Sequence, residues 1–200
     1  MRKTGTMTFA ASLAAAFFPS IASAHTGVGD TAGFFHGFEH PAGGLDHVLA
    51  MVLVGIMAWQ LGGRALYAVP ATFVLLMAAG GGIGMAGMDV PFVELGIALS
   101  VVVFGLAVAL RFKAPVLAIA PLVGLFAIFH GHAHGAEMPE NTAGLAYGLG
   151  FVLATALLHA AGIGLGFVLT KTGENHGALI ARIAGGAAAA AGFAILTGVL

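Results

Sequence analysis

The sequence predicts an all-α, polytopic membrane protein with six transmembrane helices. These helices follow a cleavable signal peptide and leave the N-terminus and the C-terminus of the mature chain in the periplasm. Two observations support this fold class. First, 60% of the 200 residues are hydrophobic and only 8% are charged, whereas a soluble domain of this size carries about 25% charged residues. Second, the apolar residues form long runs, and roughly 20 apolar residues suffice to cross a bilayer as a helix.

The N-terminal segment has the three parts of a secretory signal peptide. Arg2 and Lys3 supply positive charge, a short apolar stretch runs from Met7 to Phe18, and Ala22-Ser23-Ala24 matches a small-residue cleavage site. The alternative is an uncleaved first helix, but the apolar run is too short to span a bilayer comfortably. We therefore divide the chain into a signal peptide at residues 1–24 and a transmembrane domain at residues 25–200.

Six apolar stretches follow the signal peptide, and glycine, proline or charged residues separate them. For example, Gly62-Gly63-Arg64 ends the first stretch, and Met88-Asp89-Val90-Pro91 separates the second from the third. The predicted spans are residues 44–62, 65–86, 92–110, 114–132, 143–169 and 178–200.

The charges in the loops predict the orientation. Arg64, Arg111, Lys113 and Lys171 lie in the loops after the first, third and fifth spans, and Arg182 lies just past the last of these loops. The mature segments on the other side hold no lysine or arginine, and cytoplasmic loops carry the excess of positive charge. A cleaved signal peptide also places the mature N-terminus outside. Both arguments predict the same multi-pass topology in the bacterial inner membrane.

Glycines four residues apart recur in the predicted spans. Small residues at this spacing let helices approach each other closely in lipid. Packing within the chain explains them more simply than a dimer interface does, and a homo-oligomer stays open as an alternative. The pairs are Gly80 with Gly84, Gly144 with Gly148, and Gly162 with Gly166.

The composition limits the chemistry that the chain can perform. No cysteine is present, which excludes disulfides, thiolate metal ligands and a cysteine nucleophile. A net charge of −1 without a basic stripe argues against nucleic acid as a partner. Nine histidines outnumber the seven Lys and Arg residues, and polar residues within apolar spans mark functional sites. A metal site in this chain must use imidazole and oxygen ligands.

The first histidine cluster occupies residues 36–47, around the start of the first span. Its proline and glycines prevent one continuous helix, so we expect a turn and a helix that begins near Asp46. Imidazole and carboxylate together suit borderline divalent metals. Asp46 could ligate the metal, orient a ligating imidazole, or serve only as a carboxylate favoured by the helix dipole. The candidate residues are His36, His40, Asp46 and His47.

The second cluster lies at the outer end of the fourth span. His130 and His134 are four residues apart, so both rings share one face if the helix continues, and they could then chelate one ion. His132 points elsewhere unless the helix unwinds, whereas Glu137 could join the face of His134. The alternative is a solvated histidine-rich loop that buffers metal weakly. The apolar run reaches His130 directly, which favours an ordered site.

Three further residues are candidates for a path or for an additional ligand. Glu94 stands just inside the third span, where a buried carboxylate needs a partner, and it could ligate, carry a proton or cap the helix. His159 lies deep in the fifth span and is either a satisfied core residue or a second station for an ion that moves inward. His25 would begin the mature chain, where its amine and ring could chelate one metal.

Two segments resemble the signatures of a known family. Residues 40–55, which read HPAGGLDHVLAMVLVG, resemble the first-helix signature of the HupE/UreJ family, and residues 129–137, which read FHGHAHGAE, resemble its second signature. Residues 94–100 and the histidine of the fifth span are also similar to family features. The resemblance covers essentially the whole mature chain. It implies a secondary permease for nickel, in some members cobalt, associated with hydrogenase and urease maturation.

We therefore predict a permease rather than an enzyme, with Ni²⁺ or Co²⁺ as its substrate and no prosthetic group. Its partners are the metal ion, the lipid bilayer and, indirectly, hydrogenase or urease maturation proteins. The ion would leave near Glu174 and His176. Two alternatives stay open: a membrane accessory factor that binds metal without transport, and an intramembrane metalloenzyme, which the lack of a His-Glu-x-x-His motif disfavours. The predicted ligands are His40, Asp46, His47, His130, His134 and Glu137.

Overall fold

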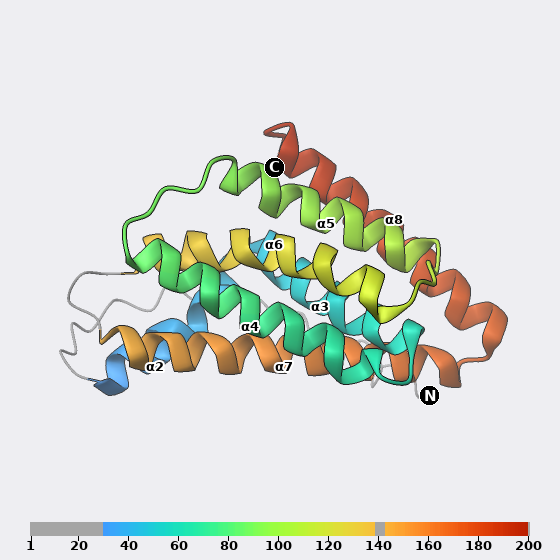
Figure 1. Cartoon of the computed structure of the whole chain (residues 1–200). Helices are drawn as coiled ribbons and strands as arrows, with labels where there is room; N and C mark the ends of the chain where they lie inside the picture. The colour runs from blue at the N-terminus through green and yellow to red at the C-terminus, as the bar shows by residue number, and fades with distance from the viewer. Residues whose placement is uncertain (1–29, 139–142, 200) are drawn as a thin grey trace, which may run out of the picture.

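The computed structural model describes residues 30–138 and 143–199, and all regular elements in these two stretches are helical (Figure 1). This confirms the all-α class, while the predicted signal peptide and His25 lie outside the described residues. The α-helices are α2 (Asp30–Glu39), α3 (Leu45–Leu61), α4 (Ala65–Met85), α5 (Val93–Ala109), α6 (Val116–Ala136), α7 (Gly144–Lys171) and α8 (Glu174–Leu196), and the 3₁₀ helix η1 (His40–Gly43) joins α2 to α3.

The lengths of the helices indicate a multi-pass membrane protein. Four helices, α4, α6, α7 and α8, are long and apolar enough to cross a membrane. Residues 33–43 and 45–61 add a fifth candidate, because they pass the same test as a pair bent by 85°. α5 is apolar but has only 17 residues. Length and composition thus support four or five spans, and each of the six predicted stretches coincides with one helix from α3 to α8.

The first histidine cluster contains a sharp break in the helix. Pro41 lies at the start of η1, and Gly44 adopts an extended backbone with φ −112° and ψ 122° before α3 begins. The predicted turn is therefore present, and Asp46 falls in the first turn of α3. The apolar pattern did not predict α2. This helix lies in backbone contact with α7, because a Cβ at Gly37 would overlap the carbonyl oxygen of Tyr147.

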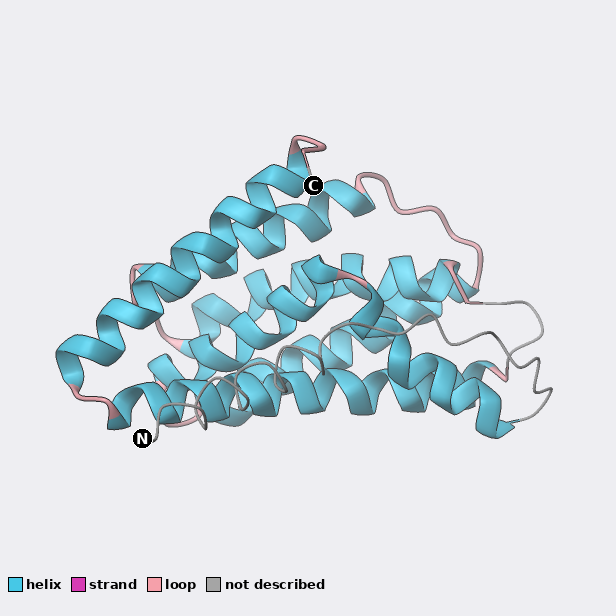
Figure 2. Ribbon diagram, turned by 180° about the vertical axis from the view of Figure 1, so that it is seen from behind, coloured by secondary structure: helices cyan, strands magenta, loops and turns pink. Residues whose placement is uncertain are grey.

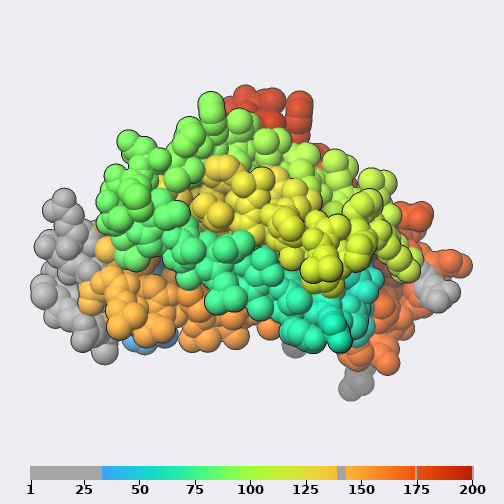
Figure 3. All heavy atoms as spheres, in the orientation of Figure 1, coloured from blue at the N-terminus to red at the C-terminus, as the bar shows by residue number. Residues whose placement is uncertain are grey.

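The helices pack mainly in pairs. α4 packs most extensively on α6, α5 on α8, and α3 and α2 both on α7 (Figures 1 and 2). The space-filling view shows α4, α6 and α7 side by side on one face (Figure 3). Two of the glycine pairs lie in these interfaces: a Cβ at Gly80 or Gly84 would overlap backbone of α6, and one at Gly162 would overlap backbone of α3. Packing within the chain is confirmed there, whereas a Cβ at Gly148 would have no described residue within 4 Å.

The basic residues gather at one end of the bundle. The loops with Arg64, Arg111 and Lys113 lie near the turn between α7 and α8, at the right in Figure 1. α2, the C-terminal end of α6 and the N-terminal end of α7 lie at the opposite end. The short turn after α3 uses Gly62 and Gly63 at φ 70° and 54°, a backbone region that glycine enters without steric cost.

Candidate metal centre

The candidate centre forms where α6 faces η1 and the start of α3. α6 continues as a helix to Ala136, so His130 and His134 share one face, as their spacing predicts. Glycines occupy the neighbouring face, because a Cβ at Gly131 or Gly135 would overlap backbone carbonyl groups of α4. This contact with α4 fixes the rotation of α6, and the imidazoles of His130 and His134 both contact the ring of His47 on α3.

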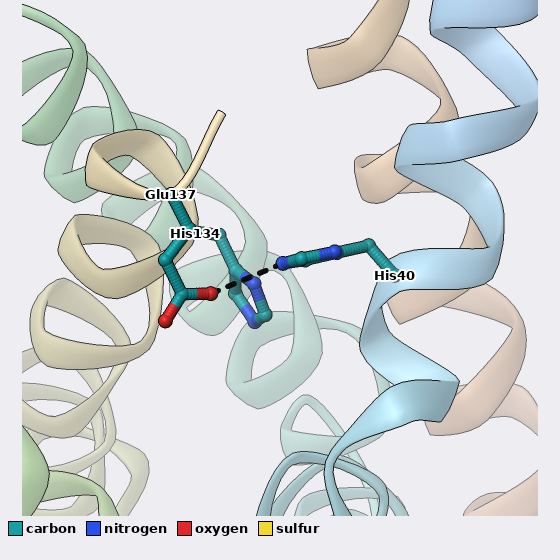
Figure 4. Close-up of side chains that lie close together, drawn as sticks. All are labelled: His40, His134 and Glu137. Carbon is teal, nitrogen blue, oxygen red and sulfur yellow. Dashed lines mark hydrogen bonds and ion pairs between the residues drawn. The ribbon is translucent and has the colours of Figure 1, made fainter. Parts of the chain in front are cut away.

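We call His40, His134 and Glu137 the outer group. His40 Nε2 lies 3.2 Å from Glu137 Oε2, and one ligand atom of each of the three side chains lies within 4.8 Å of the others. Figure 4 shows His40 reaching from its backbone toward both α6 residues. Ligands bound to one ion at about 2 Å stand roughly 3 Å apart, so small side-chain rotations would close this group around a metal.

Exposure falls steeply across the outer group. The Glu137 side chain is 59% exposed and that of His40 is 25% exposed, whereas His134 is only 4% exposed. Tyr147 covers the group from α7, because its ring lies 5.8 Å from the ring of His40 and its hydroxyl donates to the His134 carbonyl oxygen at 3.5 Å. The outer group therefore extends from the solvent-exposed carboxylate of Glu137 to the buried imidazole of His134.

We call His47, His130 and His134 the inner group. The ring centroid of His47 lies 4.7 Å from that of His130 and 4.2 Å from that of His134. All three residues are buried, and each has at least one ring nitrogen without a hydrogen-bond partner among the described residues. Buried polar atoms are nearly always partnered, so this concentration of unpaired nitrogens fits a ligand such as a metal ion.

Asp46 holds the imidazole of His47 in one orientation. His47 Nδ1 lies 2.7 Å from Asp46 Oδ1, and the same oxygen accepts the backbone N–H of His47 at 2.8 Å. A carboxylate can only accept, so Nδ1 donates and the opposite nitrogen, Nε2, presents its lone pair. Nε2 is the atom of His47 that has no hydrogen-bond partner in the described part of the chain. An acidic partner that orients a ligating histidine in this way is common at metal sites.

A buried aromatic ring separates the inner group from His159. Phe73 of α4 is fully buried, and its ring centroid lies 5.6 Å from that of His130 and 5.1 Å from that of His159. Both nitrogens of His159 are buried and without a partner in the described part of the chain. The described residues thus leave both nitrogens of His159 without a hydrogen bond, and Phe73 contacts both His159 and the inner group.

Three other predicted residues are not members of these two groups. Glu94 lies in the first turn of α5, which begins at Val93, and its side chain is exposed at the surface of the bundle. His132 points away from His130 and His134, and its Nε2 lies 2.8 Å from the Met88 carbonyl oxygen. His36 is exposed, with its ring 5.8 Å from that of His40.

Sequence reasoning missed three residues of the centre. Ser100 contacts His130, Phe73 contacts both His130 and His159, and Tyr147 contacts the outer group. The sequence contained an indication for Ser100, because a hydroxyl in an apolar span requires a partner. It contained no indication for Phe73 or Tyr147, because aromatic side chains are ordinary components of apolar helices.

Comparisons with known proteins agree with these signatures. The family model described as HupE / UreJ protein matches residues 13–195. Protein HupE of Rhizobium leguminosarum bv. viciae is 48% identical over 187 residues, which cover 93% of this chain and 95% of that protein. No solved structure matches the chain. The match to the family model and the identity to a relative over nearly the full length establish that the chain belongs to the HupE/UreJ family.

Proposed function

We propose that the chain is a permease that carries a divalent transition-metal ion, Ni²⁺ or Co²⁺, into the cytoplasm. One observation carries the proposal: four imidazoles and two carboxylates meet where η1, α3 and α6 adjoin, and the buried imidazoles hold nitrogens that have no partner among the residues that the structure describes. Imidazole with carboxylate is a ligand set for borderline divalent metals. The function is transport rather than catalysis, and the metal is cargo rather than a prosthetic group.

The proposed topology has six spans, from α3 to α8. α3 and α5 each have 17 residues, the lower limit of the range of about 17–25 residues for a spanning helix. The end of the bundle that carries the basic loops is then cytoplasmic, and the metal centre faces the periplasm. We extend the proposal to a signal peptide at residues 1–24 and to a mature transmembrane domain at residues 25–200 in the bacterial inner membrane, with both ends periplasmic.

The proposed path begins at the outer group, because Glu137 and His40 are its exposed members. His134 belongs to both groups, so it can pass the ion from the outer group to the inner group. His159 follows beyond Phe73. Toward the basic end, a cavity of about 300 Å³ opens beside Gln60 and Arg111. A transport site must bind strongly enough to admit the ion and weakly enough to release it.

The choice of metal rests on the family rather than on the ligands. Imidazole and carboxylate accept nickel, cobalt and zinc alike, and the absence of cysteine removes only the thiolate sites. The resemblance described above implies nickel, and it is also the ground for the proposed link to hydrogenase or urease maturation.

Uptake of radioactive ⁶³Ni²⁺ into proteoliposomes tests this function. We expect the wild type to accumulate nickel, and His47→Ala and His134→Ala to abolish accumulation, because each removes a ring of the inner group. His132→Gln is the matched control. It removes a histidine from the same helix, α6, but the ring of this histidine bonds to the Met88 carbonyl oxygen and is not part of the inner group. Gel filtration verifies that each variant is folded.

Two outcomes would overturn the proposal. Stoichiometric nickel binding without uptake would make the protein a metal-binding accessory factor. Uptake that persists in both His47→Ala and His134→Ala would remove the metal centre from the path. Competition by Co²⁺ and Zn²⁺ in the same vesicles ranks the three metals.

A further inference from the structure

Ser100 is a buried hydroxyl that bridges α5 to the inner group. Glu94 and Ser100 are the polar residues of α5, an otherwise apolar helix. Ser100 and His130 are both 0% exposed. The hydroxyl oxygen of Ser100 lies 2.6 Å from the carbonyl oxygen of Ile97 and 2.8 Å from Nε2 of His130. Both side chains are therefore covered from bulk solvent by the described residues, and the direction of each hydrogen bond follows from which of the paired atoms can donate.

The two contacts fix the position of one proton on His130. The Ile97 carbonyl oxygen can only accept, so the single hydrogen of the Ser100 hydroxyl points toward it. Toward His130 the Ser100 oxygen can then only accept, which requires Nε2 of His130 to carry a proton. A neutral imidazole holds one proton, so Nδ1 of His130 presents a lone pair. Nδ1 is the nitrogen of His130 that is buried without a partner among residues 30–138 and 143–199.

We infer that Ser100 is a positioning residue that commits His130 to bind the metal ion through Nδ1. This inference rests on the proposed function, since it concerns the same metal centre. Asp46 imposes the opposite choice on His47, which presents Nε2. The two rings, whose planes stand at 89°, are thus each held by one hydrogen-bond partner, Ser100 of α5 for His130 and Asp46 of α3 for His47, and each has one nitrogen with a free lone pair.

The expected effect of losing this bond is a weaker metal site rather than a lost one. Without an acceptor at Nε2, the His130 ring can carry its proton on either nitrogen and can rotate. Removal of a partner that orients a metal-binding histidine lowers metal affinity by about 10–100-fold. We expect a decrease of that size in Ni²⁺ affinity for Ser100→Ala.

The proton position can be measured without metal. In the full chain labelled with ¹⁵N-histidine and reconstituted in nanodiscs, the nitrogen shifts of a neutral imidazole identify which nitrogen is protonated. The His130 signals are assigned by their loss in His130→Gln. We expect the Nε2–H form in the wild type and a mixture of both forms in Ser100→Ala. An Nδ1–H form in the wild type overturns the inference.

Binding of Ni²⁺, measured by isothermal titration calorimetry, provides the second readout. Ser100→Thr keeps a hydroxyl, so we expect it to retain the wild-type proton position and the wild-type affinity. Ser100→Cys keeps a similar volume but offers a weaker acceptor, so we expect it to behave like Ser100→Ala. Thr155→Val is the matched control: it removes another fully buried hydroxyl, which bonds to Met77 Sδ at 3.5 Å. We expect Thr155→Val to bind as the wild type does.

These readouts separate the inference from the proposed function. Wild-type protein with the Nε2–H form that neither binds nor transports nickel would refute the proposed function and leave the role of Ser100 in positioning His130 intact. Folded Ser100→Ala and Ser100→Cys with wild-type proton position and wild-type affinity would refute the role of Ser100. An equal loss of affinity in Thr155→Val would also refute it, because the effect would then be general to buried hydroxyls.

Discussion

Substitutions of Asp46 distinguish the three roles that this carboxylate could have. Its Oδ1 oxygen accepts from both the ring and the backbone of His47, so it acts on the metal centre and on the start of α3 together. A hydrogen bond to a charged group contributes about 1.5–3 kcal/mol, and a neutral one contributes about 0.5–1.5 kcal/mol. Asp46→Asn keeps a neutral acceptor and should lose roughly the difference, about 1–1.5 kcal/mol.

The expected affinities follow from these energies. Because 1.4 kcal/mol corresponds to a factor of ten in an equilibrium constant, Asp46→Asn should bind Ni²⁺ about tenfold more weakly. Asp46→Ala leaves Nδ1 of His47 buried without an acceptor and should bind up to about 100-fold more weakly. Calorimetric titration of each purified variant with Ni²⁺ in detergent measures both values.

The pattern across the two variants decides the role. Equal and complete loss of binding in both would make Asp46 a direct ligand and refute the orienting role. Unchanged affinity in both, with only a lower melting temperature, would reduce Asp46 to a favourable charge at the start of the helix, which is worth about 0.3–1 kcal/mol.

Three other predictions test the outer group, the crossing of α3 with α7, and the ring of Phe73. Glu137→Gln should raise the nickel concentration for half-maximal uptake and leave the maximal rate unchanged, because it affects the exposed member of the outer group; a reduced maximal rate would contradict this. Gly162→Leu should lower the yield of monodisperse protein, because a Cβ there overlaps α3, while Gly164→Leu, which faces open space, should not. Phe73→Ala should lower the free energy of unfolding by about 3–5 kcal/mol, as measured by denaturant titration, and an equal decrease in the exposed-ring control Phe193→Ala would refute the argument.

Much of the helical framework could be predicted from the sequence because it depends on local patterns. Each apolar run ends at glycine, proline or charge, and these signals place the ends of α3 to α8 within a few residues. The shared face of His130 and His134 follows from helical spacing alone. The proximity of His130 and His134 to His47, by contrast, cannot be read from local patterns. It could be predicted only from the topology, which brings the start of α3 and the end of α6 to the same end of the bundle.

The features that could not be predicted from the sequence depend on contacts between helices. α2 contains glycines and polar residues, and its backbone contact with Tyr147 of α7 is not visible in its own pattern. The partner of Ser100 could not be predicted, because the rotation of α5 against α6 is set by packing. The role of Glu94 stayed open because an acidic residue at the end of an apolar run suits either a buried site or the first turn of a helix, and the structure has Glu94 in the first turn of α5.

The glycine contacts between α4 and α6 restrict which parts of the protein can move. Gly131 and Gly135 bring backbone against backbone, so α6 cannot rotate or slide without a steric clash, and the backbone that carries His130 and His134 is fixed against α4. η1, in contrast, is a single short 3₁₀ turn bounded by the extended Gly44, and it carries His40. We therefore expect the side chains of His40 and Glu137, rather than the backbone of α6, to supply the adjustment by which the outer group would close around an ion.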